Sequence, residues 1–420
     1  MDDGPEITGF SDKGRDNDKS REILGLGADL WRVAILLGLA QFSVGIWNWQ
    51  FSVHLDAFLE PWQIGLTYSS RPVAMLLGGY LSGMMADFFG RRKTMAFSLV
   101  PISFGLLTLS FFPVWPTIPI QFGLVMFGLS SVRLMQRAIP ADVVEAERSQ
   151  DPARKFMMIM VPLWAIDGIS PLIGAFLLNI GLLPTHLYLI AAIGGVLACI
   201  AVLIGIRESL GDEIIEKAKQ GPRVPIRSLG RNFWMFAGGM LTYFFFYSSA
   251  ISYLGVLCVD FWGVDLTVYG ISWSVFSFTG AIIMYAMSGI ADKNLKAALT
   301  AAVFGNGLTF VGFGLGSGDL WLIILNIIWA FPFMLWLGGV RSIVASTVSE
   351  ELKGRAFGTY DMVLGLTAMF AASFGALLWQ ISGSLRLVWI LAGIGMILVT
   401  FVIAFVLKRI EIHRNQMPEE

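Results

Sequence analysis

The sequence predicts an all-α polytopic membrane protein, with twelve transmembrane helices in two pseudo-symmetric six-helix bundles. Three observations support this fold class. Hydrophobic residues make up 56% of the 420 positions and charged residues 14%, long apolar stretches recur along the chain, and Lys and Arg gather in alternate connections. Soluble domains are about 45–50% apolar and about 25% charged. The excess of apolar residues therefore indicates membrane spans and not a large soluble core.

A bilayer core of about 30 Å needs roughly 20 apolar residues of helix. Backbone polar groups in lipid must be satisfied within the segment, so apolar stretches of this length are predicted to be helices. Twelve such stretches are found at 30–54, 62–86, 94–113, 117–140, 156–180, 184–206, 234–258, 265–290, 298–316, 319–345, 356–382 and 385–408.

The positions of the 29 Lys and Arg residues orient these spans. Outside the spans they fall in the termini and in every second connection, and Arg386 is the only one assigned to the opposite side. Lys and Arg concentrate in cytoplasmic loops. We therefore expect a multi-pass protein of the cell membrane (plasma or inner membrane) with both termini in the cytoplasm.

The same pattern predicts the domain organisation. The expected parts are a cytoplasmic N-terminal tail (1–29), an N-terminal bundle (30–206), a cytoplasmic central loop (207–233), a C-terminal bundle (234–408) and a cytoplasmic C-terminal tail (409–420). The two bundles are predicted to be diverged repeats, because Leu129-Ser-Ser-Val-Arg133 in the fourth span is echoed by Leu337-Gly-Gly-Val-Arg341 in the tenth. Two halves with internal repeats are typical of secondary transporters.

The connection after the second span carries a recognisable motif. Its sequence, Gly83-Met-Met-Ala-Asp87-Phe-Phe-Gly90-Arg91-Arg92, resembles the signature of the major facilitator superfamily. The turn after the tenth span, with Glu350 and Arg355, resembles the acidic and basic turn of the same family. The resemblance covers residues 30 to 408. It implies two six-helix bundles that rock about a central site and open it to alternate sides of the membrane.

The resemblance also implies a cytoplasmic latch between the bundles, formed by Gly83, Asp87, Gly90, Arg91, Arg92, Glu350 and Arg355. An Asp at a helix end can accept hydrogen bonds from Arg and lie near the positive N-terminus of another helix. The alternative is that Asp87 caps the turn and that its basic neighbours only set the topology.

Ionisable residues at membrane depth are costly and are candidates for function. They are Arg71, Arg133, Arg137, Asp167, Arg341 and Asp361. Arg71, Arg133 and Arg341 are predicted to bind substrate, because the guanidinium fork suits a carboxylate or phosphate. Asp167 is the predicted proton carrier, since burial and pairing act in opposite directions on the proton affinity of a carboxylate. Structural alternatives remain, namely an Asp167–Arg ion pair and an Arg341–Asp361 pair.

Two further side chains are expected to contact substrate. Asn48 lies on one face of the first span with Gln41 and Ser52, and Tyr247 shares a face of the seventh with Tyr243. The family resemblance has spans one, four, seven and ten line the cavity. The alternative for both residues is packing between helices.

The composition disfavours several other classes of protein. The two cysteines, Cys199 and Cys258, and the three scattered histidines form no disulfide or metal pattern, so no metal and no cofactor are expected. A net charge of −1 gives no reason to expect a nucleic-acid partner. No nucleophile–base pair emerges, so an enzyme is not expected.

The leading hypothesis is a secondary active transporter of a small anionic organic solute, coupled to H⁺, with Na⁺ as the other possible coupling ion. The alternative is a proton-driven exporter of multidrug or amphipathic compounds, which the partial span-five motif at Ser170-Pro171 and the 13% aromatic content support. A third hypothesis is a membrane sensor on the same fold, which would need a signalling domain.

Overall fold

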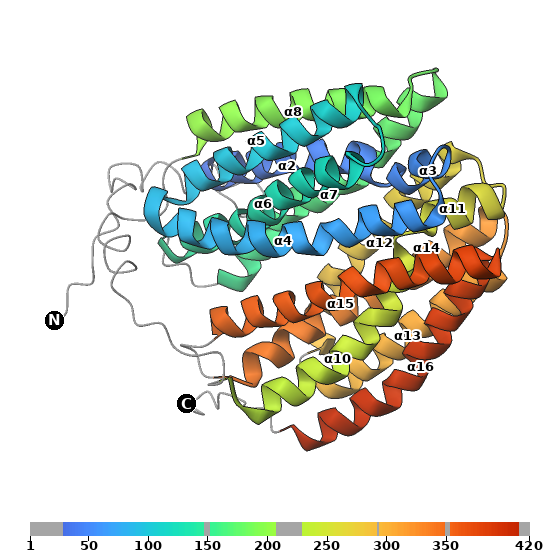
Figure 1. Ribbon diagram of the computed structural model, residues 1–420. Coiled ribbons are helices and arrows are strands. Elements are labelled where there is room, and N and C mark those ends of the chain that lie inside the picture. Colours follow the sequence, from blue (N-terminus) through green and yellow to red (C-terminus); the bar gives the residue numbers. More distant parts are fainter. Residues whose placement is uncertain (1–27, 147–151, 207–228, 292–293, 349–352, 411–420) are drawn as a thin grey trace. The chain divides into compact units, whose positions relative to one another are not determined.

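The computed structural model describes residues 28–146, 152–206, 229–291, 294–348 and 353–410, and these are almost entirely helical (Figure 1). Most of the predicted tails and of the central loop lies outside the described residues, and so does Glu350. The helices that follow the twelve predicted spans are α2 (Ala28–Asn48) continued by α3 (Phe51–Asp56), α4 (Pro61–Phe89), α5 (Arg91–Phe111), α6 (Ile118–Ala146), α7 (Pro152–Asn179), α8 (Pro184–Gly205), α10 (Gly230–Ile251) continued by α11 (Leu254–Val256) and η4 (Leu257–Phe261), α12 (Leu266–Ala291), α13 (Leu295–Leu315), α14 (Asp319–Ser346), α15 (Lys353–Ser382) and α16 (Leu385–Arg409).

The lengths and apolar composition of these helices suit a membrane, which confirms the predicted fold class. Within the described residues, eight helices are individually long and apolar enough to cross a bilayer. A ninth span is formed if α10 and the segment Leu254–Phe261, which are bent by 46° at their junction, are counted together. Large hydrophobic side chains are exposed on these helices, for example Ile381 (76%) and Phe401 (69%). Such a surface requires an apolar surrounding.

The chain packs into two compact units. The first contains Met1–Asn48 and Ala74–Pro222, and the second contains Trp49–Val73 and Arg223–Glu420. The division falls inside α4, whose first part packs with the second unit. As a result, α3 and the beginning of α4 are structural components of the unit that otherwise comes from the C-terminal half of the chain.

The two units repeat the same helix packing. In the first, α5 packs on α6 and α8, and α2 packs on α7 and α8. In the second, α13 packs on α14 and α16, and α10 packs on α15 and α16. Each of these four contacts in the first unit has its counterpart six spans later in the second, as the diverged repeat of Arg133 and Arg341 predicts.

A basic side chain caps the last helix of each unit at equivalent positions. Arg92 is the second residue of α5, and its Nη1 donates to the carbonyl of Ile206, the residue that ends α8, at 3.4 Å. Lys296 is the second residue of α13, and its Nζ donates to the carbonyl of Ile410, which ends α16, at 2.6 Å. The last carbonyls of a helix lack partners within it, and a cation there also complements the helix dipole.

We expect Lys296→Met to lower the stability of the folded protein, because it removes this charge-assisted bond while keeping an apolar side chain of similar length. A hydrogen bond to a charged group contributes about 1.5–3 kcal/mol, and partial exposure of Lys296 places the expected loss at the lower end of that range. Thermal unfolding of the purified protein in detergent measures it. Lys408→Met is the matched control because Lys408 is exposed. Equal melting temperatures for the two variants would contradict a capping role.

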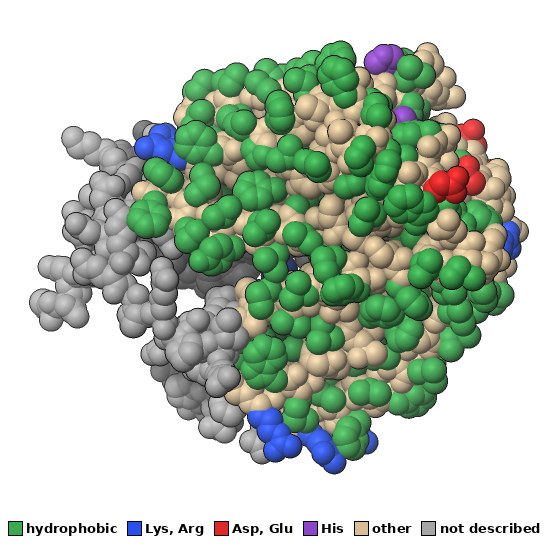
Figure 2. Space-filling view, in the orientation of Figure 1, with side chains coloured by type: hydrophobic (Ala, Val, Ile, Leu, Met, Phe, Trp, Pro, Cys, Tyr) green, Lys and Arg blue, Asp and Glu red, His purple; other side chains and the backbone are tan. Residues whose placement is uncertain are grey.

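Charge is segregated between the two ends of the second unit. Figure 2 shows acidic side chains gathered near α3 and basic side chains where α16 ends. Glu60 and Asp260 both lie within electrostatic reach of Asp56, while Lys408 and Arg409 occupy the last turn of α16.

Candidate functional site

The first part of α4 is fixed tightly within the second unit. Ser69 Oγ donates to the carbonyl of Met369 on α15 at 2.6 Å and lies 2.7 Å from Ser373 Oγ. Gly65, one turn earlier, has no room for a side chain, because a Cβ there would meet Ala376 on α15. These contacts set the position of Arg71, which follows half a turn after Ser69.

Arg71 lies deep within the second unit and still has accessible surface. Its guanidinium interacts electrostatically with the phenol groups of Tyr68 on α4 and Tyr247 on α10. A buried guanidinium that keeps accessible surface can receive an anion, because its five donors cannot all be satisfied by two phenols. The structure thus brings together two of the predicted substrate-binding residues, Arg71 and Tyr247.

Tyr247 belongs to an aromatic cluster formed by Tyr243, Phe244 and Tyr247 on α10 and Trp336 on α14. The planes of three of these rings are nearly parallel. Phe244 and Tyr247 are inclined by 18° with centroids 5.8 Å apart, Phe244 and Trp336 by 13° at 6.2 Å, and Tyr247 and Trp336 by 22° at 6.0 Å. Phe244 and Tyr247 are partly exposed, so their rings are available for contact.

Two polar atoms of the aromatic cluster are buried without hydrogen-bond partners among the described residues. They are the hydroxyl of Tyr243 and Nε1 of Trp336. Leaving a buried donor unsatisfied costs about 1–3 kcal/mol. A bound polar ligand or water would recover this free energy, so the two donors mark a place where such a group is favoured.

The predicted proton carrier lies in the first unit, against α2. Gln41 Nε2 donates to Oδ1 of Asp167 on α7 at 2.6 Å. The two helices approach closely here, because a Cβ on Gly45 would lie 2.7 Å from Ser170 Cβ and 3.7 Å from Asp167 Oδ1. Asp167 is partly exposed. The Gln41 amide therefore helps to hold the carboxyl group in place, and part of the Asp167 side chain remains accessible.

The other predicted substrate residues are partly exposed and are divided between the two units. Arg133 on α6 and Asn48 at the end of α2 belong to the first unit. Arg341 on α14 belongs to the second, and it lies with Asp361 within electrostatic reach of Tyr360. Arg341 follows Trp336 by about 7 Å along the helix, at 1.5 Å per residue. This position is compatible with the predicted structural pair of Arg341 and Asp361.

The connection between α4 and α5 forms the predicted sharp turn. Gly90 has φ 87°, a conformation that favours glycine, and begins α5. Arg91 Nη1 donates to the carbonyl of Ala138 on α6 at 2.7 Å, so Arg91 and Arg92 both bind helix carbonyls within the first unit.

The remaining predicted latch residues are described only in part. Gly83 lies in α4 with open space around it. Asp87 and Arg355 lie in α4 and α15, but their side chains are outside the described residues, and Glu350 is outside them entirely.

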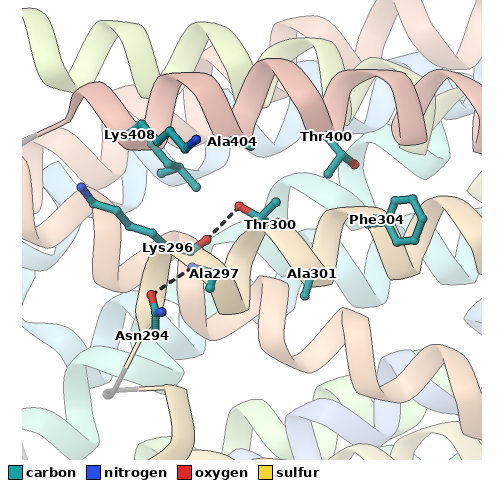
Figure 3. A pocket seen from close by; sticks show the side chains of 10 residues that line it. Asn294, Lys296, Ala297, Thr300, Ala301, Phe304, Thr400, Ala404 and Lys408 are labelled. Carbon is teal, nitrogen blue, oxygen red and sulfur yellow. Dashed lines mark hydrogen bonds between the residues drawn. The ribbon is translucent and has the colours of Figure 1, made fainter.

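A pocket of about 500 Å³ lies elsewhere in the second unit, between the beginning of α13 and the end of α16 (Figure 3). Lys296 and Lys408 line it together with apolar side chains such as Phe304. Phe310, which contacts Tyr247, is about 21 Å along α13 from Lys296, at 1.5 Å per residue. The pocket is therefore separate from Arg71 and the aromatic cluster.

Two carboxyl groups meet at the acidic end of the second unit. Asp56 ends α3, after the predicted span 30–54, and Asp260 lies in η4, after the predicted span 234–258. They share a hydrogen bond, which requires a proton on one of them. Burial, with the Asp260 charge and this hydrogen bond, raises the pKa of Asp56 from 3.8 to about 6.

The raised pKa of Asp56 makes the folded protein less stable at high pH. Between pH 3.8 and about 6 the folded state holds more protons than the unfolded state, so stability falls as the pH rises through this window. We expect Asp56→Asn to melt a few degrees above the wild type at pH 7.5 and to lose this advantage at pH 4. Asp319→Asn, which removes an exposed carboxylate from the first turn of α14, should give no such increase. A variant less stable than the wild type at pH 7.5 would contradict the shared proton.

Several of these features were not predicted from the sequence. Phe244 and Trp336 join Tyr247 only because α10 and α14 meet, and the carbonyls bound by Arg91 and Arg92 are likewise set by packing. The pair of Asp56 and Asp260 joins residues far apart in the chain. Acidic residues directly after two apolar spans were the only signal that could have suggested it.

Comparison with known proteins identifies a family, a set of relatives and a set of solved structures with the same fold. The family model described as Major Facilitator Superfamily matches residues 30–363. A synaptic vesicle 2-related protein of Xenopus laevis is 30% identical over 117 residues, which are 26% of this chain and 21% of that protein. The match thus spans about a fifth of the length of that relative.

Solved transporter structures share the fold. The nucleoside transporter NupG gives a TM-score of 0.72 at 14% identity and covers 91% of this chain and 100% of its own. A human organic anion transporter gives a TM-score of 0.63 at 17% identity, with 89% and 99% covered. At these identities the likeness concerns the fold alone.

Proposed function

This chain belongs to the Major Facilitator Superfamily, and from that premise we propose that it moves a small anionic organic solute across the membrane by alternating access, coupled to protons. Membership of the family makes it a transporter with multiple membrane spans and a small-molecule substrate. The anionic nature of the solute, the coupling ion and the residues that serve each role are our proposals.

Arg71 is the observation that carries the proposal. Its side chain lies deep in the second unit, keeps accessible surface and interacts electrostatically with the Tyr247 phenol. Arginine keeps its positive charge at any physiological pH and offers a planar fork for a carboxylate. We assign anion binding to Arg71 and Tyr247, with Arg133, Arg341 and Asn48 as further contacts during the transport cycle.

Proton coupling is assigned to Asp167. The carboxyl group is partly exposed and accepts a hydrogen bond from Gln41. Carboxylates at membrane depth serve as proton relays in pumps and transporters, and the accessible surface of Asp167 allows it to exchange a proton. We also propose that both termini lie in the cytoplasm and that the protein resides in the plasma or inner membrane, on the basis of its Lys and Arg distribution.

The proposed latch consists of Gly83, Asp87, Gly90, Arg91, Arg92, Glu350 and Arg355. Within this set, Arg91 and Arg92 already bind carbonyls inside the first unit. The contacts that would change during transport are therefore assigned to Asp87, Glu350 and Arg355.

Uptake by proteoliposomes tests the proposal. A panel of labelled organic acids is offered with an inward proton gradient, and the matching uncharged amides are offered as controls. Saturable, gradient-dependent uptake of at least one acid is the expected result. Export of lipophilic dyes without uptake of any acid would instead support the exporter, which the apolar rings beside Arg71 could also serve.

A further inference from the structure

We propose that the transported anion carries a planar aromatic ring, so that the substrate class is an aryl carboxylate. This inference rests on the proposed function. It adds that the aromatic cluster of Tyr243, Phe244, Tyr247 and Trp336 binds the ring while Arg71 binds the carboxylate.

The near-parallel alignment of the rings is the first observation. The planes of Phe244, Tyr247 and Trp336 lie within 22° of one another. Trp329 lies two helical turns before Trp336 on α14 and packs differently. Its contacts with Phe276, Phe310 and Phe313 are tilted or edge-on, the usual geometry of a packed apolar core. Parallel planes, in contrast, present ring faces on which another flat ring can stack.

Exposure separates the two tryptophan environments further. Trp329 is 1% exposed, and it has a partner for its indole nitrogen, since Nε1 donates to Asn306 Oδ1 at 3.0 Å. Around Trp336, the neighbouring Phe244 and Tyr247 are partly exposed. The aromatic cluster thus combines partly exposed rings with near-parallel ring planes.

Polar groups at the edge of the cluster complete the site. Arg71 lies within electrostatic reach of Tyr247, so a carboxylate on Arg71 places its substituent beside the cluster. The Tyr243 hydroxyl and Trp336 Nε1 are buried and have no hydrogen-bond partners among the described residues. Both are donors, and an oxygen of an aryl carboxylate or a ring substituent would satisfy them.

Paired ligands test the ring requirement. Binding to the purified full-length protein is measured by isothermal titration calorimetry for benzoate, phenylacetate and 3-phenylpropanoate, and for the same three acids with a saturated cyclohexyl ring. Each pair has the same charge and nearly the same volume. We expect the aryl acid of the preferred pair to bind roughly 3- to 10-fold more tightly, the range that aromatic stacking adds to burial.

Two variants test whether the aromatic cluster is the source of the preference for the aryl acid. Trp336→Leu and Phe244→Leu should each bring the two acids of a pair to equal affinity, while Phe304→Leu, on the distant pocket of α13, should leave the preference unchanged. Thermal unfolding establishes that each variant is folded. If either Trp336→Leu or Phe244→Leu does not fold, the other variant alone tests the role of the cluster.

The outcomes separate this inference from the proposed function. Equal affinity for both acids of every pair, lost in Arg71→Gln, would overturn the aromatic requirement and leave the anion transporter intact. An aryl preference that persists in both Trp336→Leu and Phe244→Leu would also overturn it. Absence of binding by all six acids would count against both proposals.

Discussion

Arg71→Gln is expected to lower kcat/KM for uptake of the anionic solute by about 100-fold. The substitution leaves an amide that can still donate a hydrogen bond but removes the charge and the fork. Charge-assisted hydrogen bonds contribute about 1.5–3 kcal/mol each, and a loss near the upper end corresponds to this factor. Arg71→Lys keeps the charge without the planar fork, so it should fall between the wild type and the glutamine variant.

Initial rates of uptake by proteoliposomes measure the effect, with Lys408→Gln as the control because it removes an exposed cation at the end of α16. The contacts of Ser69 and Gly65 that fix this part of α4 do not involve the guanidinium, so the variant should fold. Uptake by Arg71→Gln within about threefold of the wild type would remove Arg71 from the binding site, since it would leave less than about 0.7 kcal/mol to the charge.

Asp167→Asn is expected to abolish accumulation driven by a proton gradient while preserving exchange of solute across the membrane. Asparagine cannot carry the proton. Its Oδ1 can still accept the hydrogen bond from Gln41 Nε2, which spans 2.6 Å in the wild type, so the packing of α2 on α7 is retained. The two activities therefore separate in this variant.

Counterflow of labelled solute and net uptake under an imposed pH gradient, measured on the same vesicles, distinguish the outcomes. The control is Gln41→Glu, which places a carboxyl group on α2 at the same contact. It tests whether proton coupling requires the carboxyl group on α7 or accepts one on either helix. Accumulation by Asp167→Asn at the wild-type level would show that another group, or another ion such as Na⁺, drives the transport.

The helices that follow the twelve predicted spans could be predicted because each is a local property of composition and length. The turn at Gly90 could also be predicted, since a glycine between an apolar helix and the basic triplet Arg91-Arg92-Lys93 is a short-range pattern. Its φ of 87° agrees with that interpretation. The division of the chain inside α4 could not be predicted, because it depends on contacts such as that of Ser69 with Met369.

Individual residues of the candidate site could be predicted from the sequence, but the way in which they group could not. Arg71 and Asp167 stood out because a charge in an apolar stretch is costly, and Tyr243 and Tyr247 because they share a helix face. The sequence assigned Arg71 to the predicted N-terminal bundle with Arg133 and Asp167, whereas in the structure Arg71 belongs to the second unit together with Tyr247. Trp336 completes the aromatic cluster through packing of helices distant in the chain, for which a single sequence carries no periodic signal.

Labelling of a single cysteine at position 247 tests alternating access at this site most directly. Tyr247→Cys is made in a chain with Cys199→Ala and Cys258→Ala, and a membrane-impermeant maleimide is applied to sealed vesicles from the outside or trapped inside. The account predicts labelling from both sides and protection by a transported acid. Labelling from one side only, unchanged by solute and by pH, would contradict it.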